Sequence, residues 1–248
     1  MSPEKTGRGA RNLREMFEAL GERYLQMPFT QGTAQEVDFL ADLLKLTPKH
    51  RIIDVACGPG RHSVALARRG FKVVGVDISD KLLGIARRTA ELESVPVEFV
   101  KADAREIPYT DEFDAGLCLC EGAFGLLETD SENERVLNSI FRCLKPGGKL
   151  VLTALNLLRL LQHEKDLSGF DPQTNMMLRF EKHAVEGGEE ELFKYHERYY
   201  SFPELKMLLD RVGFRHILGF GCRVGAYSAR AITVDDYELL VIAEKPAR

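Results

Sequence analysis

IIDVACGPGRH, residues 52–62, joins a short apolar run to a glycine turn and then to the start of a helical pattern. Gly58 and Gly60 have no Cβ, so the backbone N–H groups of this turn and a helix N-terminus can approach a ligand closely. Asp54 places a carboxylate at the carboxyl end of the expected strand, where open α/β sheets bind ligands. The stretch therefore predicts a strand, a turn and a helix with a ligand site at the turn.

Outward from this stretch, strand and helix patterns alternate five times. This alternation predicts an α/β fold with a doubly wound, mostly parallel sheet and helices on both faces. Two further strands are expected near the C-terminus. The seven expected strands are 50–54, 71–77, 97–100, 113–120, 149–155, 215–220 and 237–244.

The pattern changes after Asn156. Residues 157–175 are expected to be irregular, and 176–185 and 190–200 read as two strands joined at Gly187-Gly188, which is a hairpin signal. This predicts a small antiparallel β insertion after the fifth strand. Capping boxes are expected where helices begin, at 33–36, 129–132 and 201–204.

Composition restricts the class of protein. The chain has 248 residues, enough for one large domain, and a formal net charge of −4, which disfavours a basic nucleic-acid surface. The apolar runs are too short to span a bilayer, and the first residues lack a signal-peptide core. Five cysteines without a C-x-x-C pair indicate reduced thiols and a cytoplasmic protein, and a metal site at Cys118 and Cys120 lacks further ligands.

The segment 54–60 resembles motif I of the class I S-adenosylmethionine-dependent methyltransferases, with Ala56 in place of the first glycine. Asp77, Asp103 and the turn 145–149 follow in the order of that family. The resemblance covers 45–155 and, by pattern, 201–245. It implies a single methyltransferase domain over 1–248, with a seven-stranded sheet and an antiparallel C-terminal strand. It also implies an N-terminal helical cap over 1–45 and an insertion over 157–200 that acts as a lid or a homodimer contact.

The resemblance also implies a cofactor, S-adenosyl-L-methionine, with S-adenosyl-L-homocysteine as the product. Asp77 is expected to accept hydrogen bonds from the ribose hydroxyls, Asp103 and Ala104 to bind adenine, and Asp54 to hold the ammonium group. Ile78 and Phe99 are expected as apolar plates for the adenine. The full cofactor-binding set comprises Asp54, Ala56, Gly58, Gly60, Asp77, Ile78, Asp103, Ala104 and Cys120.

The segment 120–124 favours a small-molecule methyl acceptor. It lacks the Asp/Asn-Pro-Pro-aromatic motif of enzymes that methylate nucleic-acid amines and the Pro-Cys nucleophile of pyrimidine C5 enzymes. Only one glutamate is present, whereas the protein-arginine enzymes use two. The expected substrate-binding residues are Tyr24, Phe29, Glu121 and Phe124, the catalytic candidates are Glu121, His196 and Tyr200, and no metal, nucleic-acid or membrane partner is expected.

Two alternatives stay open. Gly58-x-Gly60-x-x-Ser63 is close to the dinucleotide fingerprint, which would indicate an NAD(P)-dependent oxidoreductase, although no hydride-transfer motif accompanies it. A non-catalytic regulatory protein that binds S-adenosylmethionine would have the same motifs. Methyl transfer from a sulfonium is an in-line displacement that depends mainly on alignment of the nucleophile, so the sequence indicates the cofactor better than the acceptor.

Overall fold

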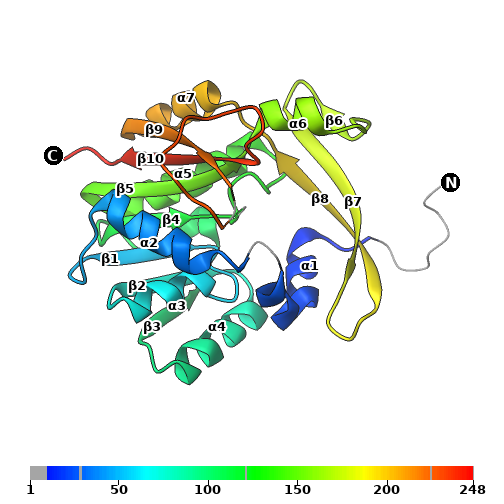
Figure 1. Cartoon of the computed structure of the whole chain (residues 1–248). Helices are drawn as coiled ribbons and strands as arrows, with labels where there is room; N and C mark the ends of the chain where they lie inside the picture. The colour runs from blue at the N-terminus through cyan, green and yellow to red at the C-terminus, as the bar shows by residue number, and fades with distance from the viewer. Residues whose placement is uncertain (1–9, 28–29, 121, 224, 248) are drawn as a thin grey trace.

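The computed structural model describes residues 10–27, 30–120, 122–223 and 225–247. Its central sheet has seven strands in the order β3-β2-β1-β4-β5-β10-β9 (Figure 1). The strands from β1 to β5 pair in parallel, whereas β10 runs antiparallel to β5 and β9, which confirms the fold class predicted from the sequence. The bounds are β1 (Arg51–Val55), β2 (Lys72–Asp77), β3 (Val97–Lys101), β4 (Phe113–Cys118), β5 (Leu144–Leu155), β9 (Arg215–Cys222) and β10 (Glu238–Glu244).

Helices cover both faces of this sheet. Strand β1 shows why: Ile52 belongs to the buried cluster that includes residues of α2 and α3, and Ile53 to the cluster that includes residues of α5 and α7. Successive side chains of a strand point to opposite faces, so a sheet that is buried on both faces needs an uninterrupted apolar run. The helices are α1 (Leu13–Leu20), η1 (Gly21–Gln26), α2 (Thr33–Leu44), α3 (Arg61–Arg68), α4 (Asp80–Leu92), η3 (Ala104–Glu106), α5 (Asp130–Cys143), α6 (Leu157–His163) and α7 (Phe202–Val212).

The strand order reverses at β1. This strand pairs with β2 on one side and with β4 on the other, and the chain continues outward in both directions. At such a switch point the loops beyond the carboxyl ends of the strands diverge and leave a crevice. The glycine turn that follows β1 lies at this crevice.

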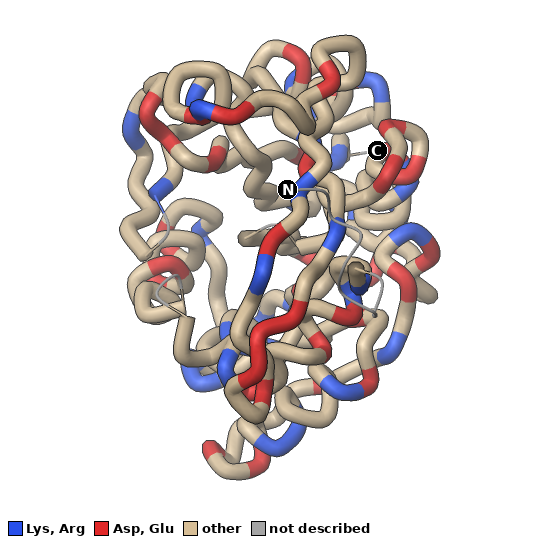
Figure 2. The backbone as a smooth tube through the Cα atoms, turned by 90° about the vertical axis from the view of Figure 1, so that its right-hand side faces the viewer, with Lys and Arg blue, Asp and Glu red and all other residues tan. Residues whose placement is uncertain are grey.

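The insertion forms a separate sheet of β6 (Phe170–Asp171), β7 (Met176–Ala184) and β8 (Glu190–Arg198). Figure 2 views the long β7–β8 hairpin from outside, where it crosses the front of the molecule. Helix α1 packs against the hairpin through Met16, Leu20, Val185 and Phe193. The chain at Arg11 also pairs with β8, because Arg11 N donates to Leu192 O at 3.1 Å and Arg11 O accepts from Lys194 N at 2.7 Å.

Three local predictions were wrong. Residues 157–175 include helix α6, whose N-cap Asn156 accepts from Leu158 N, and the short strand β6. Strand β4 ends at Cys118, because Cys120 has φ 52° and leaves the extended conformation. The capping box at 33–36 does not form, because Gly32 is the N-cap of α2, Thr33 is already its first residue, and the Glu36 side chain accepts from Arg61.

The capping box predicted at 201–204 is complete, with Ser201 and Glu204 at the start of α7. At 129–132 only half of the predicted box forms, because Thr129 accepts from Glu132 N but the Glu132 side chain accepts from the Thr129 hydroxyl. None of the helices in the part of the chain that the structure describes has the length and apolar character needed to cross a membrane.

Candidate active site

A cavity of about 520 Å³ lies at the carboxyl ends of β1, β2 and β4. Residues of α1, η1 and β8 line it from the opposite side, so the N-terminal helix and the hairpin cover the glycine turn. Of the residues expected to bind cofactor or substrate, those that line the cavity are Tyr24, Asp54, Ala56, Gly58, Asp77, Ile78, Asp103, Ala104 and Cys120, and the catalytic candidate His196 joins them.

Two buried carboxylates dominate the floor of this cavity. Asp77 accepts from Gly58 N at 2.9 Å and from Ser79 N at 2.8 Å, and Asp54 accepts from Ser63 Oγ at 2.6 Å. Burial raises the pKa of both Asp54 and Asp77, and the charge of Asp54 raises the pKa of Asp77 further. Two carboxylates that are close together out of water favour a ligand with positive charge.

The two glycines of the turn have different roles. Gly58 has φ 54°, and no described atom lies within 4 Å of the position that a Cβ would take. A Cβ on Gly60, which has φ 79°, would lie 2.8 Å from Ala86 Cβ and 3.1 Å from Phe99 Cζ. Gly58 therefore leaves room beside the cavity, whereas Gly60, which does not line the cavity, lets α3 pack closely. Phe99 fills the space below Gly60 and is not a plate that lines the cavity.

Ala56 has φ 55°, a left-handed conformation that costs an L-residue with a Cβ about 1 kcal/mol or more. We expect Ala56→Gly to raise the free energy of unfolding by about 1 kcal/mol, measured by urea denaturation. Ala65→Gly, the same change inside α3, is the control and should lower it by about 1 kcal/mol. A loss of stability in the Ala56 variant would contradict the predicted strain.

The adenine end of the expected site contains an ion pair that the sequence did not indicate. Arg105 binds the Asp103 carboxylate. Its Nη2 donates to Oδ2 at 2.6 Å, and its backbone N donates to Oδ1 at 2.9 Å. The hydrogen bonds from Arg105 lower the pKa of Asp103 and keep it ionised. Arg105 Nη1 also donates to Glu132 of α5, so Asp103 has a fixed orientation and would share its oxygens with any adenine amine.

Two candidates lie away from the cavity. Tyr200 comes after β8 ends, and its ring stacks on Phe124 with the centroids 5.1 Å apart. The two residues are 1% and 2% exposed and belong to the core cluster that includes residues of α5 and α7. Neither lines the cavity. Phe29 and Glu121 lie outside the described residues.

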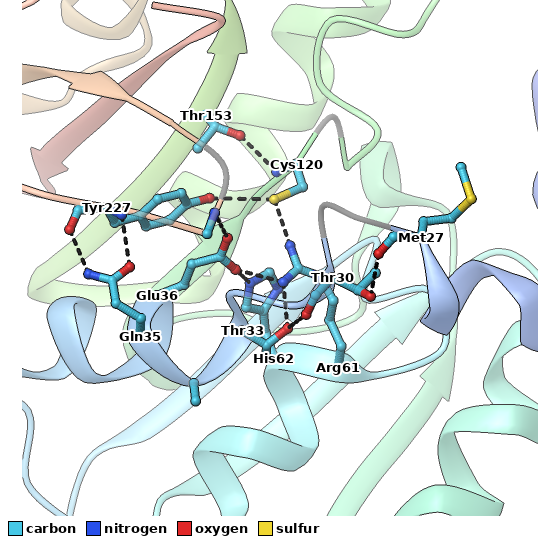
Figure 3. Close-up of polar contacts among 12 residues, drawn as sticks. Met27, Thr30, Thr33, Gln35, Glu36, Arg61, His62, Cys120, Thr153 and Tyr227 are labelled. Atoms are coloured by element: carbon cyan, nitrogen blue, oxygen red, sulfur yellow. Dashed lines mark hydrogen bonds and ion pairs between the residues drawn. The ribbon is translucent and has the colours of Figure 1, made fainter.

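Beside Cys120, a buried polar network extends from the cavity into the protein (Figure 3). Glu36 Oε2 accepts from Arg61 Nη1 at 2.6 Å and lies 2.8 Å from His62 Nε2, and Glu36 Oε1 accepts from Gly225 N at 2.8 Å. Arg61 Nη2 donates to Cys120 Sγ at 2.8 Å, and the Tyr227 hydroxyl lies 3.4 Å from the same sulfur. The network thus joins α2, α3, the end of β4 and the segment before β10.

Ligand atoms of Glu36, His62 and Cys120 lie within 4.8 Å of one another, a spacing that metal sites also have. The Arg61 guanidinium, however, bridges the carboxylate and the thiol. The guanidinium therefore lies between the Glu36 carboxylate and the Cys120 thiol, where a metal ion would have to bind. It also compensates the negative charge of Glu36. The geometry therefore supports a charge network more than a metal centre.

Two features of the sequence indicate this network, although no motif contains them. Arg61 is the first residue of α3, although cations are disfavoured at helix N-termini, so its guanidinium needs an external partner there. Glu36 lies one turn before Leu40 on the buried face of α2, where an unpaired acid would be costly. Neither signal indicates that these side chains meet.

Glu238, at the start of β10, is a second buried acid in this region and is 1% exposed. Its Oε1 has no hydrogen-bond partner among the described residues, and burial raises its pKa from 4.5 to about 7. Because the folded pKa exceeds the unfolded one, ionisation of Glu238 lowers stability as the pH rises through this range.

We therefore expect Glu238→Gln to raise the free energy of unfolding at about pH 8 by up to about 3 kcal/mol and to change it little at about pH 4. Urea denaturation of both proteins across this pH range measures the difference. A difference that is the same at both ends would contradict the raised pKa.

Comparisons with known proteins agree with the geometry. A family model described as a methyltransferase domain matches residues 52–148. The chain is 40% identical to the demethylmenaquinone methyltransferase of Thermus thermophilus over 112 residues, 44% of this chain and 48% of that protein. It is 29% identical to the glycine/sarcosine N-methyltransferase of Parasynechococcus marenigrum over 237 residues, 89% of this chain and 83% of that protein.

Among solved structures, the CcbJ methyltransferase from Streptomyces caelestis superposes with a TM-score of 0.75 at 18% identity, over 93% of this chain and 97% of that one, which shows a shared fold. The chain spans about half the length of the curated methyltransferases that it matches. The matched regions cover 60%, 40% and 48% of three of them.

Proposed function

Because the chain belongs to the class I S-adenosylmethionine-dependent methyltransferases, we propose that it binds this cofactor in the cavity and methylates a small-molecule acceptor. One observation carries the proposal. Three acids line a single cavity: Asp54 is the last residue but one of β1, Asp77 ends β2, and Asp103 follows β3. The doubly wound sheet brings these strand ends to one edge, and the three carboxylates meet there around one cavity.

The chemistry of these carboxylates fits the cofactor. An ionised carboxylate offers about four lone-pair sites. Asp77 uses one on each oxygen for Gly58 N and Ser79 N, so one site on each oxygen stays available for two ribose hydroxyls. Asp54 supplies the negative charge for an ammonium group, and Ile78, which is 41% exposed in the cavity wall, provides an apolar surface for adenine.

S-adenosylmethionine supplies an activated methyl group on a sulfonium. The protein has to place the acceptor atom in line with that methyl and to exclude water. Residues of α1, η1 and β8 that line the cavity, including Tyr24 and His196, suit this role because they cover the carboxyl ends of the strands. We therefore propose that 157–200 acts as a lid. The same segment is our candidate for a homodimer contact, and analytical ultracentrifugation tests whether the protein forms a dimer.

The acceptor is a small molecule in this proposal. Relatives of the chain are named for demethylmenaquinone, glycine and sarcosine, which supports this class without choosing among nitrogen, oxygen and sulfur nucleophiles. His196 is the candidate base that lines the cavity, whereas the burial of Tyr200 beneath Phe124 disfavours a direct role for that residue.

Calorimetry with S-adenosylmethionine, S-adenosylhomocysteine and NAD tests the cofactor. We expect binding of the first two and none of NAD, and the opposite result would favour the oxidoreductase alternative. A screen of small amines, acids, thiols and phenols for release of S-adenosylhomocysteine then tests for turnover. Cofactor binding without turnover of any acceptor would favour the regulatory alternative.

A further inference from the structure

Arg61 is a cation at the N-terminus of a helix, where positive charge is disfavoured. It is the first residue of α3, directly after the glycine turn, and its side chain is only 6% exposed. It nevertheless lines the cavity. A buried guanidinium that lies against a cavity has little contact with bulk water, so a ligand that enters the cavity is its natural remaining partner.

The hydrogen bonds of Arg61 leave part of the guanidinium unused. The group has five N–H donors. Nη1 donates to Thr33 Oγ1 at 2.7 Å and to Glu36 Oε2 at 2.6 Å, and Nη2 donates to Cys120 Sγ at 2.8 Å. Within residues 10–27, 30–120, 122–223 and 225–247, the Nε–H and the second proton of Nη2 have no partner.

The partners of Arg61 also fix its orientation. Glu36 and Thr33 hold one nitrogen from α2, and Cys120 holds another from the end of β4. The planar group therefore cannot turn away without breaking a buried ion pair, and it presents its unused donors in one direction. Lys194, another cation of the cavity wall, is exposed and lies over the Phe180 ring, so its ammonium is not fixed in this way.

The amino-acid end of the proposed cofactor has a different place for its carboxylate. Helix α3 has no side-chain cap, so its first backbone N–H groups stay available beside the glycine turn. The guanidinium, by contrast, extends to Cys120, just beyond the end of β4. It is therefore a second group in the cavity wall, separate from those backbone N–H groups, that can bind an anionic group.

We propose that Arg61 binds a carboxylate of the methyl acceptor, so that the substrate is a small nucleophile that also carries a carboxylate group. This inference rests on the proposed methyltransferase function. Arginine suits the role because adjacent nitrogens of its planar group can donate to both oxygens of one carboxylate.

The test uses propionate and its neutral analogue propionamide as probes, titrated by calorimetry into protein saturated with S-adenosylhomocysteine at constant ionic strength. We expect the protein to prefer propionate over propionamide by about tenfold or more, and Arg61→Gln to abolish the preference. Arg61→Lys should keep only part of it. Arg68→Gln is the matched control and should keep the full preference, because Arg68 lies on the same helix but pairs with Glu93 at the surface, away from the cavity.

Arg61→Gln leaves Glu36 buried without its cation, so Arg61→Gln combined with Glu36→Gln provides a second, charge-balanced variant that should also lose the preference.

Equal binding of propionate and propionamide to the unaltered protein would overturn the inference. A loss of S-adenosylhomocysteine affinity in the Arg61 variants, with the propionate preference retained, would assign the guanidinium to the cofactor instead. If the unaltered protein does not bind S-adenosylhomocysteine at all, the proposed function itself fails, and this result is visible before any probe is added.

Discussion

Glu36→Ala is expected to lower the free energy of unfolding by about 3–5 kcal/mol, because it leaves the Arg61 guanidinium buried without a counter-charge. Glu36 is fully buried, and Arg61 and His62 both lie within hydrogen-bond distance of one of its oxygens. The other oxygen accepts from Gly225 N, so the backbone before Tyr227 also loses a partner. Urea denaturation near neutral pH measures the change.

The acid limb of the stability curve provides an independent test of the same residue. Burial acts to raise the pKa of Glu36, but the hydrogen bond from His62 and the charge of Arg61 outweigh it and lower the pKa from 4.5 to about 2. A folded pKa below the unfolded one stabilises the protein above the unfolded value. We therefore expect about 3 kcal/mol of stability to be lost as the pH falls from about 4.5 to about 2, and Glu36→Gln should flatten this part of the curve.

Asp38→Ala is the matched control, because Asp38 lies on the same helix and pairs with Arg69 at the surface. It should have a much smaller effect, since exposed ion pairs contribute little. Replacing Glu36 and Arg61 together by apolar residues of similar size should recover part of the loss, because a buried ion pair costs most when only one partner is removed. Additive losses in the double variant would contradict the predicted coupling.

The fold could be predicted because its signals are local or repeated. The apolar run at Ile52-Ile53, the glycine turn after it and the regular alternation of strands and helices each follow from short-range chemistry, and the hairpin at Gly187-Gly188 does as well. The missed helix α6 is short, and its start depends on the Asn156 side chain, which is a weaker signal than a capping box.

The cofactor half of the site could be inferred for a related reason. Its carboxylates occur at strand ends, and strand ends in a doubly wound sheet share one edge. The polar network could not be inferred, because Glu36, Arg61 and Cys120 come from three elements whose side chains meet only in the packed structure. Tyr200 was misplaced because the expected strand was two residues too long, which put its ring on the same face as His196.

The acid at the end of β2 gives the largest expected effect on ligand binding. Asp77 is 8% exposed, and both of its oxygens accept backbone N–H groups at the edge of the cavity. Those bonds orient the carboxylate toward the proposed ribose position and also hold Gly58 in the turn. Asp77→Ala therefore removes the acceptor for two hydroxyls and loosens the turn that faces the same ligand.

A hydrogen bond to a charged group contributes about 1.5–3 kcal/mol, so we expect Asp77→Ala to weaken S-adenosylmethionine binding by about tenfold to a hundredfold in calorimetry. Asp77→Asn should lose less, because one amide oxygen can still accept.

The fold should persist in circular dichroism, since burial and the charge of Asp54 disfavour the ionised Asp77 carboxylate and its removal relieves that cost. Asp80→Ala removes an equal charge from the exposed start of α4, where Asp80 pairs with Lys101, and should leave the affinity nearly unchanged. Unchanged affinity in a folded Asp77→Ala protein would mean that the ribose lies elsewhere, because no other carboxylate in the described part of the cavity has backbone donors on both oxygens and a lone pair left on each.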